Sequence, residues 1–105
     1  MALTQDFKVT VKARAEREPA FRRALLLEGM ECMLLGDLDT GKALLRDYIN
    51  ATMGFEALGD MVGTPPKSLM RMFGPKGNPR ADNLMGVLAT LQQQEGVRLQ
   101  LSTLQ

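Results

Sequence analysis

Apolar residues recur at helical spacing along most of the chain, and turn-forming residues divide this pattern into separate segments. Each segment is bounded by a proline, a glycine or an aspartate, residue types that end or cap helices. We therefore expect an all-α fold, a compact bundle of about five to six helices. The expected helices run from about Thr4 to Ala15, Pro19 to Leu35, Asp37 to Met53, Phe55 to Val62, Pro66 to Phe73 and Ala81 to Gln94.

The first three expected helices each have one apolar side. Thr4 is the expected cap of the first helix, and either Asp37 or Asp39 is the expected cap of the third. Because Gly36-Asp37 is a short connection, the second and third helices should pack as an antiparallel pair. The residues expected on the inward sides are Phe7, Val11 and Ala15, then Phe21, Leu25, Met30, Met33 and Leu34, then Leu44, Leu45, Tyr48, Ile49 and Thr52. On the third helix, Lys42, Arg46, Asp47 and Asn50 are expected on the opposite, solvent side.

The last expected helix turns Leu84, Val87, Leu88 and Leu91 inward and ends at Gly96. Beyond it, Val97, Leu99 and Leu101 alternate with polar residues. Alternation of this kind is typical of a strand, so we expect a short strand here.

The composition of the chain excludes several classes of function. With 105 residues, 45% apolar and 24% charged, the chain fits one globular domain. Thirteen basic residues against twelve acidic ones argue against a generic polybasic coat for nucleic acid. Having no histidine and one cysteine, the chain has no disulfide framework and no ordinary zinc site, and we expect no cofactor and no metal. Lacking a signal peptide and a bilayer-length apolar run, it is expected in the cytoplasm with no membrane partner.

The two short helices around Gly63 have the spacing of a DNA-binding helix-turn-helix. Gly59 would let the helices approach closely, and Gly63 would supply a positive φ in the turn. Leu58, Val62, Leu69 and Met72 would face the shared interior. An αα-corner that merely packs is the alternative interpretation of this spacing.

Charge favours the DNA-binding interpretation. Between Met61 and Ala81 there is no acidic residue, while four cations occur there. Unopposed cations are what a phosphate-facing surface requires. At the start of the second short helix, the residues predicted to read base edges are Pro66, Lys67, Ser68 and Arg71. Those predicted to contact phosphates are Thr64, which would also cap this helix, and Lys76, Asn78 and Arg80.

The same residues carry a resemblance. The stretch from Gly54 to Met72 and the loop Gly74-Pro75-Lys76-Gly77-Asn78-Pro79, followed by Asn83-Leu84, resemble the HigA-like addiction-module antidote proteins. This resemblance covers roughly Asp37 to Leu101. It implies a λ-repressor-like helix-turn-helix, a homodimer that binds its own operator on double-stranded DNA, and a RelE- or HigB-like toxin as a partner.

We therefore expect a transcriptional regulator, an antitoxin autorepressor, with no catalytic residues. Within one compact domain, residues 1–53 would form N-terminal helices that serve as a dimer or partner surface. Residues 54–105 would form the DNA-binding part.

Two other classes of function stay open. An enzyme would need a second cluster beside the acid pairs Glu28 with Glu31 and Asp37 with Asp39, and no base accompanies Cys32. Solvated helix faces and caps explain the acids better, and Arg22 and Arg23 are interpreted as a solvated pair. The other alternative is a helical protein-interaction module that binds a toxin or another partner without DNA, for which the eight methionines would supply an adaptable surface.

Overall fold

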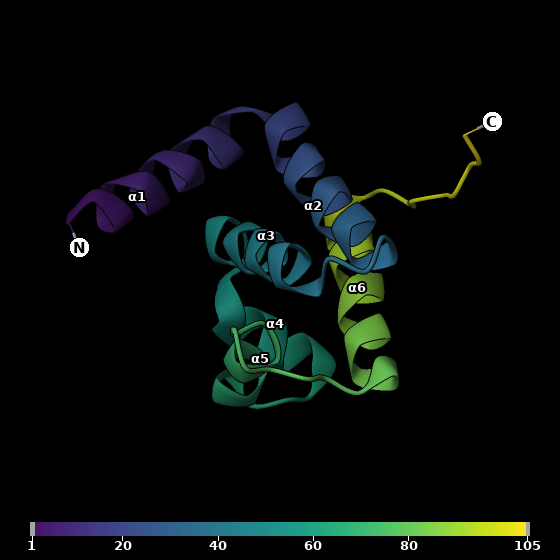
Figure 1. The fold of residues 1–105 in the computed structure, drawn as a ribbon. Coiled ribbons are helices and arrows are strands. Elements are labelled where there is room, and N and C mark those ends of the chain that lie inside the picture. Colours follow the sequence, from purple (N-terminus) through teal and green to yellow (C-terminus); the bar gives the residue numbers. More distant parts are fainter. Residues whose placement is uncertain (1, 105) are drawn as a thin grey trace.

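Six helices build the fold, and no strand occurs in residues 2–104, the backbone that the structure describes. The structure is a computed structural model, and it describes side chains for residues 9–104. The expected all-α class is confirmed, with helix boundaries close to those predicted. In chain order the helices are α1 (Ala2–Arg17), α2 (Pro19–Leu34), α3 (Leu38–Ala51), α4 (Gly54–Val62), α5 (Pro66–Met72) and α6 (Ala81–Glu95) (Figure 1).

A proline and an aspartate determine where α2 and α3 begin. Glu18 has an extended backbone (φ −123°, ψ 96°), which breaks the helix between α1 and α2, and Pro19 opens α2. Asp37 caps α3, because its side chain accepts a hydrogen bond from Thr40 N at 3.3 Å. The prediction that Thr4 caps the first helix was wrong, since Thr4 lies inside α1.

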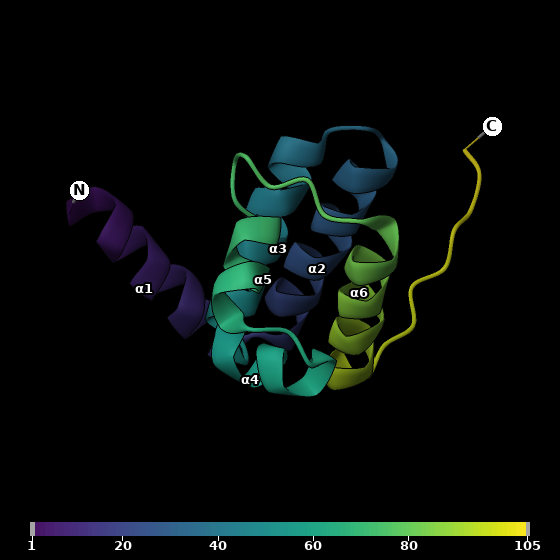
Figure 2. The ribbon, with the colours of Figure 1, turned by 90° about the horizontal axis from the view of Figure 1, so that it is seen from below.

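Helices α2 and α3 pack as the expected antiparallel pair (Figure 2). Their backbones approach closely at two glycines. A Cβ on Gly29 would lie 2.8 Å from Leu45 Cγ, and one on Gly41 would lie 3.0 Å from Gly29 O. On α2 the expected inward position of Leu34 was wrong: Leu34 is 65% exposed, whereas Leu26, which was not predicted, is fully buried. The buried stripe of α2 follows Leu26 and Gly29, and Leu34 lies off that line.

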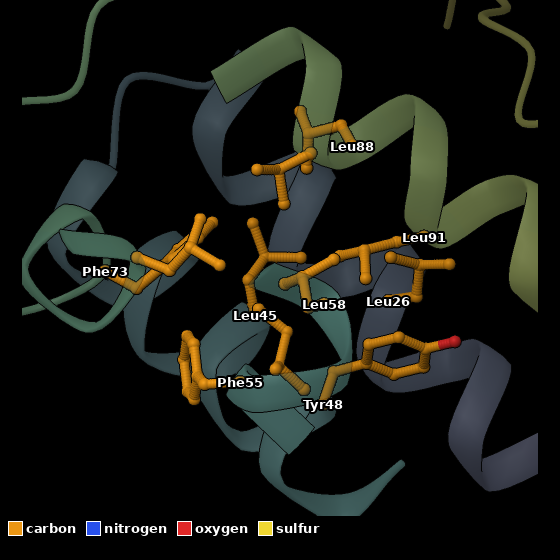
Figure 3. Packing of buried hydrophobic residues seen from close by; sticks show 11 residues of the cluster. Leu26, Leu45, Tyr48, Phe55, Leu58, Phe73, Leu88 and Leu91 are labelled. Carbon is orange, nitrogen blue, oxygen red and sulfur yellow. The ribbon is translucent and has the colours of Figure 1, made fainter. Parts of the chain in front are cut away.

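One apolar core joins α2 to α6. It draws side chains from both sides of residue 53, so the N-terminal and C-terminal segments share a single interior. Phe55 and Phe73 lie with ring centres 6.4 Å apart at one end of it. The fully or nearly fully buried members are Leu26, Leu45, Tyr48, Ile49, Phe55, Leu58, Leu69, Phe73, Val87, Leu88 and Leu91 (Figure 3).

Helix α1 projects from this body as an arm (Figures 1 and 2). Among its described side chains only Ala15 is buried, and Val11 is half-buried. The expected inward position of Phe7 lies outside the side chains that the structure describes. The arm is therefore attached to the body through its C-terminal end.

The strand expected at residues 97–101 is not present. The chain there is extended, and Leu99 N donates to Gln92 Oε1 at 2.9 Å rather than to another strand. Val97 packs against the core, while Leu101 is 78% exposed. Alternating side chains alone do not make a strand when the rest of the described chain is helical and offers no partner for its backbone.

Candidate functional site

The turn between α4 and α5 is tight and depends on two glycines. Gly63 has φ +71° and ψ 32°, the left-handed conformation that glycine adopts without a Cβ penalty. Gly63 N and Thr64 N both donate to Gly59 O, at 2.8 and 3.1 Å. A Cβ on Gly59 would lie 2.6 Å from Thr64 O, so any larger residue there would push the turn away from α4.

Helix α5 begins without a side-chain cap. Its N-cap is Pro65, whose carbonyl accepts hydrogen bonds from Ser68 N and Leu69 N at 3.0 and 3.1 Å. The expectation that Thr64 caps this helix was wrong, because α5 starts one residue later than a Thr64 cap requires. Prolines are tolerated at its first positions because the amides they lack would have no partner within the helix.

Helix α5 has one buried side and one exposed side. Leu69 is fully buried and Met72 is partly buried against the core. Lys67 and Arg71 are exposed, and residues four apart on a helix share a face. The structure therefore presents these two cations together on the outer side of α5.

The residues predicted as a nucleic-acid surface are accessible to different extents. Five of them are exposed, namely Lys67, Arg71, Lys76, Asn78 and Arg80. The remaining three, Thr64, Pro66 and Ser68, are half-buried. The three half-buried residues lie in the turn or in the first turn of α5. Their predicted roles are not tested by the geometry and stay predictions.

The cations of this surface differ in their ionic partners. Among the side chains described for residues 9–104, none forms an ion pair with Lys67, Arg71 or Lys76. Arg80 differs, because Arg80 Nη2 lies 3.2 Å from Asp82 Oδ2. Both side chains of that pair are exposed, so it is weak. Three of the four cations thus keep an unopposed positive charge.

Two cations of α3 hold the loop that follows α5. Lys42 Nζ donates to Gly77 O at 2.8 Å, and Arg46 Nη1 donates to Phe73 O at 3.0 Å. The prediction that Lys42 and Arg46 face solvent was wrong: Lys42 is buried and Arg46 is half-buried. Lys42 lies three positions before buried Leu45 and Arg46 three before buried Ile49, so helical spacing was an available signal for their burial although not for their partners.

A second set of charges lies between α2, α3 and α6 and surrounds the buried carboxylate of Glu95. Arg22 Nε donates to both oxygens of Glu95, at 2.8 and 2.9 Å, and Arg22 Nη1 donates to Ala15 O at 3.2 Å. Tyr48 Oη donates to Glu95 Oε1 at 2.5 Å. Arg23 Nε lies 3.4 Å from Glu95 Oε2. The expectation that Arg22 is solvated was therefore wrong, whereas Arg23 is exposed as expected. Glu95 was overlooked although it follows Leu91 by one helical turn.

The protonation of this cluster follows from its contacts. Burial alone would raise the pKa of Glu95, but the hydrogen bonds from Arg22 and Tyr48 outweigh it and hold that pKa below its ordinary value of 4.5. Burial, with the bond to Glu95, raises the pKa of Tyr48 well above its ordinary value of 10.0. Glu95 is therefore ionised and Tyr48 neutral at pH 7, and the cluster joins three helices and the end of α1.

Two hollows of similar size lie on the surface. One, of about 330 Å³, lies between α5 and α6. The other, of about 300 Å³, lies beside the Arg22 and Glu95 pair. In the first, apolar Val62, Leu69, Met72 and Val87 are accompanied by the polar residues Thr64, Asp82, Asn83 and Thr90.

Comparisons with protein-family models, curated proteins and solved structures gave no match to the chain. In the described part of the chain, none of the helices combines the length and the apolar character needed to cross a bilayer.

Proposed function

We propose that the protein is a sequence-specific DNA-binding transcriptional regulator in which α4 and α5 form a λ-repressor-like helix-turn-helix. The observation that carries this proposal is the outer face of α5, where Lys67 and Arg71 are exposed and no described side chain forms an ion pair with either. A B-DNA major groove about 12 Å wide admits an α-helix, so α5 is the element that enters it.

The roles on this surface follow from position. Lys67 and Arg71 donate to guanine O6 and N7, and Pro66 and Ser68 approach base edges at the start of α5. Thr64, Lys76, Asn78 and Arg80 contact phosphates. Because Arg80 is already engaged with Asp82, its contribution is the weakest of these cations.

An αα-corner that only packs accounts for less of what is observed. Such a corner needs a tight turn and a buried side, both of which α4 and α5 have. It gives no reason for a stretch of twenty-one residues, 61–81, without one acid in a chain of nearly balanced charge. That imbalance favours a partner that is an anion.

Binding to a fluorescein-labelled 30-base-pair duplex of mixed sequence, measured by anisotropy, tests the proposal. We expect binding that weakens steeply with salt and is lost in the Lys67→Ala/Arg71→Ala double variant. Lys12→Met is the matched control, because it removes an exposed cation from α1, away from this face. Equal binding by the wild type and the double variant would contradict the proposal.

The regulator is further proposed to be an antitoxin autorepressor that acts as a homodimer in the cytoplasm. The resemblance to HigA-like antidotes supports this finer assignment. A dimer would place two copies of α5 about 34 Å apart, one turn of the duplex. Footprinting on the DNA upstream of its own gene should show two protected half-sites at that spacing, and sedimentation should give a dimer. A single protected half-site with a monomer would contradict it.

A helical interaction module is the second candidate. One observation favours it: Leu34, Leu35 and Leu38 at the corner of α2 and α3 are 65%, 85% and 53% exposed. Adjacent exposed leucines mark partner surfaces more often than isolated ones do. Co-expression with the product of the neighbouring gene distinguishes the two functions, because the module predicts a stable complex and no duplex binding by the free protein.

A further inference from the structure

The loop of residues 74–79 is held in place by a hydrogen bond from α3. Lys42 and Arg46 lie one helical turn apart and reach two carbonyls of the segment that leaves α5, those of Gly77 and Phe73. The last carbonyls of a helix have no partners within it and form its negative end. Arg46 donates to the carbonyl of Phe73, the C-cap of α5. Its guanidinium therefore gives that carbonyl a partner and places a positive charge at the negative end of the helix.

The contact of Lys42 makes departure of the loop costly. Its side chain is only 8% exposed, and its nearest carboxylate, Asp39, lies 4.0 Å away and is itself 90% exposed. The carbonyl of Gly77 is thus the closest partner of a buried ammonium group. If the loop moved away, that ammonium would lose its charge-assisted hydrogen bond.

Gly77 shows how closely the loop follows the end of α5. A Cβ at this position would clash with Arg71 O, and it would lie 2.6 Å from Met72 O. Gly77 N also donates to Gly74 O at 3.0 Å, which closes the loop into a turn. Lys76 directly precedes Gly77, so the loop keeps this exposed cation beside the last turn of α5, which carries Arg71.

We propose that Lys42 is a positioning residue for duplex binding: it never touches the nucleic acid, and it fixes the loop so that Lys76 meets the phosphate backbone together with Arg71. This inference rests on the proposed function. It assigns a role to a buried cation of α3 that lies outside the helix pair α4–α5. A purely structural Lys42 would lower the stability of the fold without any special dependence on Lys76.

The test is a double-mutant cycle between Lys42→Met and Lys76→Ala on the same mixed-sequence 30-base-pair duplex. Methionine keeps the length of the buried stem and removes the ammonium. We expect Lys42→Met alone to weaken binding roughly tenfold and to lower the salt slope by about one, as Lys76→Ala does. In the Lys76→Ala background, Lys42→Met should change affinity less than about twofold. Lys12→Met, which also removes one positive charge, should leave the slope closer to that of the wild type.

Additive effects of the two substitutions, or an unchanged slope in Lys42→Met, would overturn the inference. Circular dichroism and unfolding establish that each variant is folded at the temperature of the assay. If Lys42→Met does not fold, Gly77→Ala replaces it in the cycle, because the added methyl would press against the carbonyls of Arg71 and Met72 and so displace the same loop. Failure of the proposed function gives a different result, since the wild-type protein itself would then show no salt-dependent duplex binding.

Discussion

Tyr48 and Glu95 are 47 positions apart in the chain, and the hydroxyl of Tyr48 donates to Glu95 Oε1 at 2.5 Å. The bond joins the last turn of α3 to the last turn of α6. Glu95 also accepts from Arg22 of α2, so one carboxylate connects three helices. Because the carboxylate side chain is only 2% exposed, these donors replace water as its hydrogen-bond partners, and Arg22 also supplies the opposing charge.

Glu95→Gln should therefore destabilise the protein. The substitution leaves Arg22 partly buried without its counter-ion, and we expect a loss of about 2 kcal/mol in the free energy of unfolding. Urea unfolding followed by circular dichroism measures it. Glu18→Gln is the matched control, since Glu18 pairs with Arg14 at an exposed site, and it should change stability by less than about 0.5 kcal/mol. Equal effects of the two substitutions would show that burial of the Glu95 pair contributes nothing.

The same residue predicts a dependence on pH. Its folded-state pKa lies below the ordinary value of 4.5, so the ionised form is favoured by folding. The stability from Glu95 is therefore fully present above pH 4.5 and decreases as the pH falls through the lowered folded-state value. Unfolding at a series of pH values from 7 to 3 should show the gap between wild type and Glu95→Gln narrowing toward acid. A gap that stays constant over this range would contradict the assignment.

Two glycine substitutions should have opposite effects. Gly59→Ala puts a methyl group against the carbonyl of Thr64 and should cost about 2 kcal/mol, because the obstructing atom is backbone. Gly86→Ala, on the exposed side of α6, meets nothing within 4 Å and should stabilise by about 0.5–1 kcal/mol through better helix propensity. Thermal unfolding compares the two variants directly. Stabilisation by Gly59→Ala would mean that the turn does not require close approach.

Substitutions on α5 should separate base contacts from phosphate contacts. Once an operator is known, Lys67→Ala or Arg71→Ala should cost about 1–3 kcal/mol of binding and relax the preference at one base pair. Lys76→Ala should instead weaken binding evenly across sequences. Binding to a set of single-base-pair operator variants distinguishes these patterns. A uniform loss from all three substitutions would refute base reading while leaving phosphate binding intact.

Local signals predicted the helices well, and long-range contacts account for most of what was missed. Pro19, Asp37 and Gly63 act on their own backbone, so their effects could be read from the sequence. Lys42 donates a hydrogen bond to a carbonyl 35 positions away, and the periodicity of α3 cannot predict that partner. Leu34 shows the converse, because an apolar residue near a helix end stays exposed when no element covers it.

The features of the candidate surface also divide into those that helical spacing predicts and those that depend on tertiary contacts. The exposure of Lys67 and Arg71 follows from helical spacing around Leu69, and the sequence was sufficient to predict it. The pairing of Arg80 with Asp82 depends on side-chain rotamers, and the support of the loop by α3 depends on tertiary packing. Both lie beyond what spacing along the chain encodes.

The shared interior has a practical consequence for protein engineering. Leu58 and Leu69, from the two short helices, are fully buried in the same cluster as Leu45 of α3 and Leu91 of α6. A peptide that carried α4 and α5 alone would expose these leucines to water and would not hold its shape. Any graft of α4 and α5 onto another scaffold must therefore include α3 and α6, or the host must supply an equivalent apolar surface that covers these leucines.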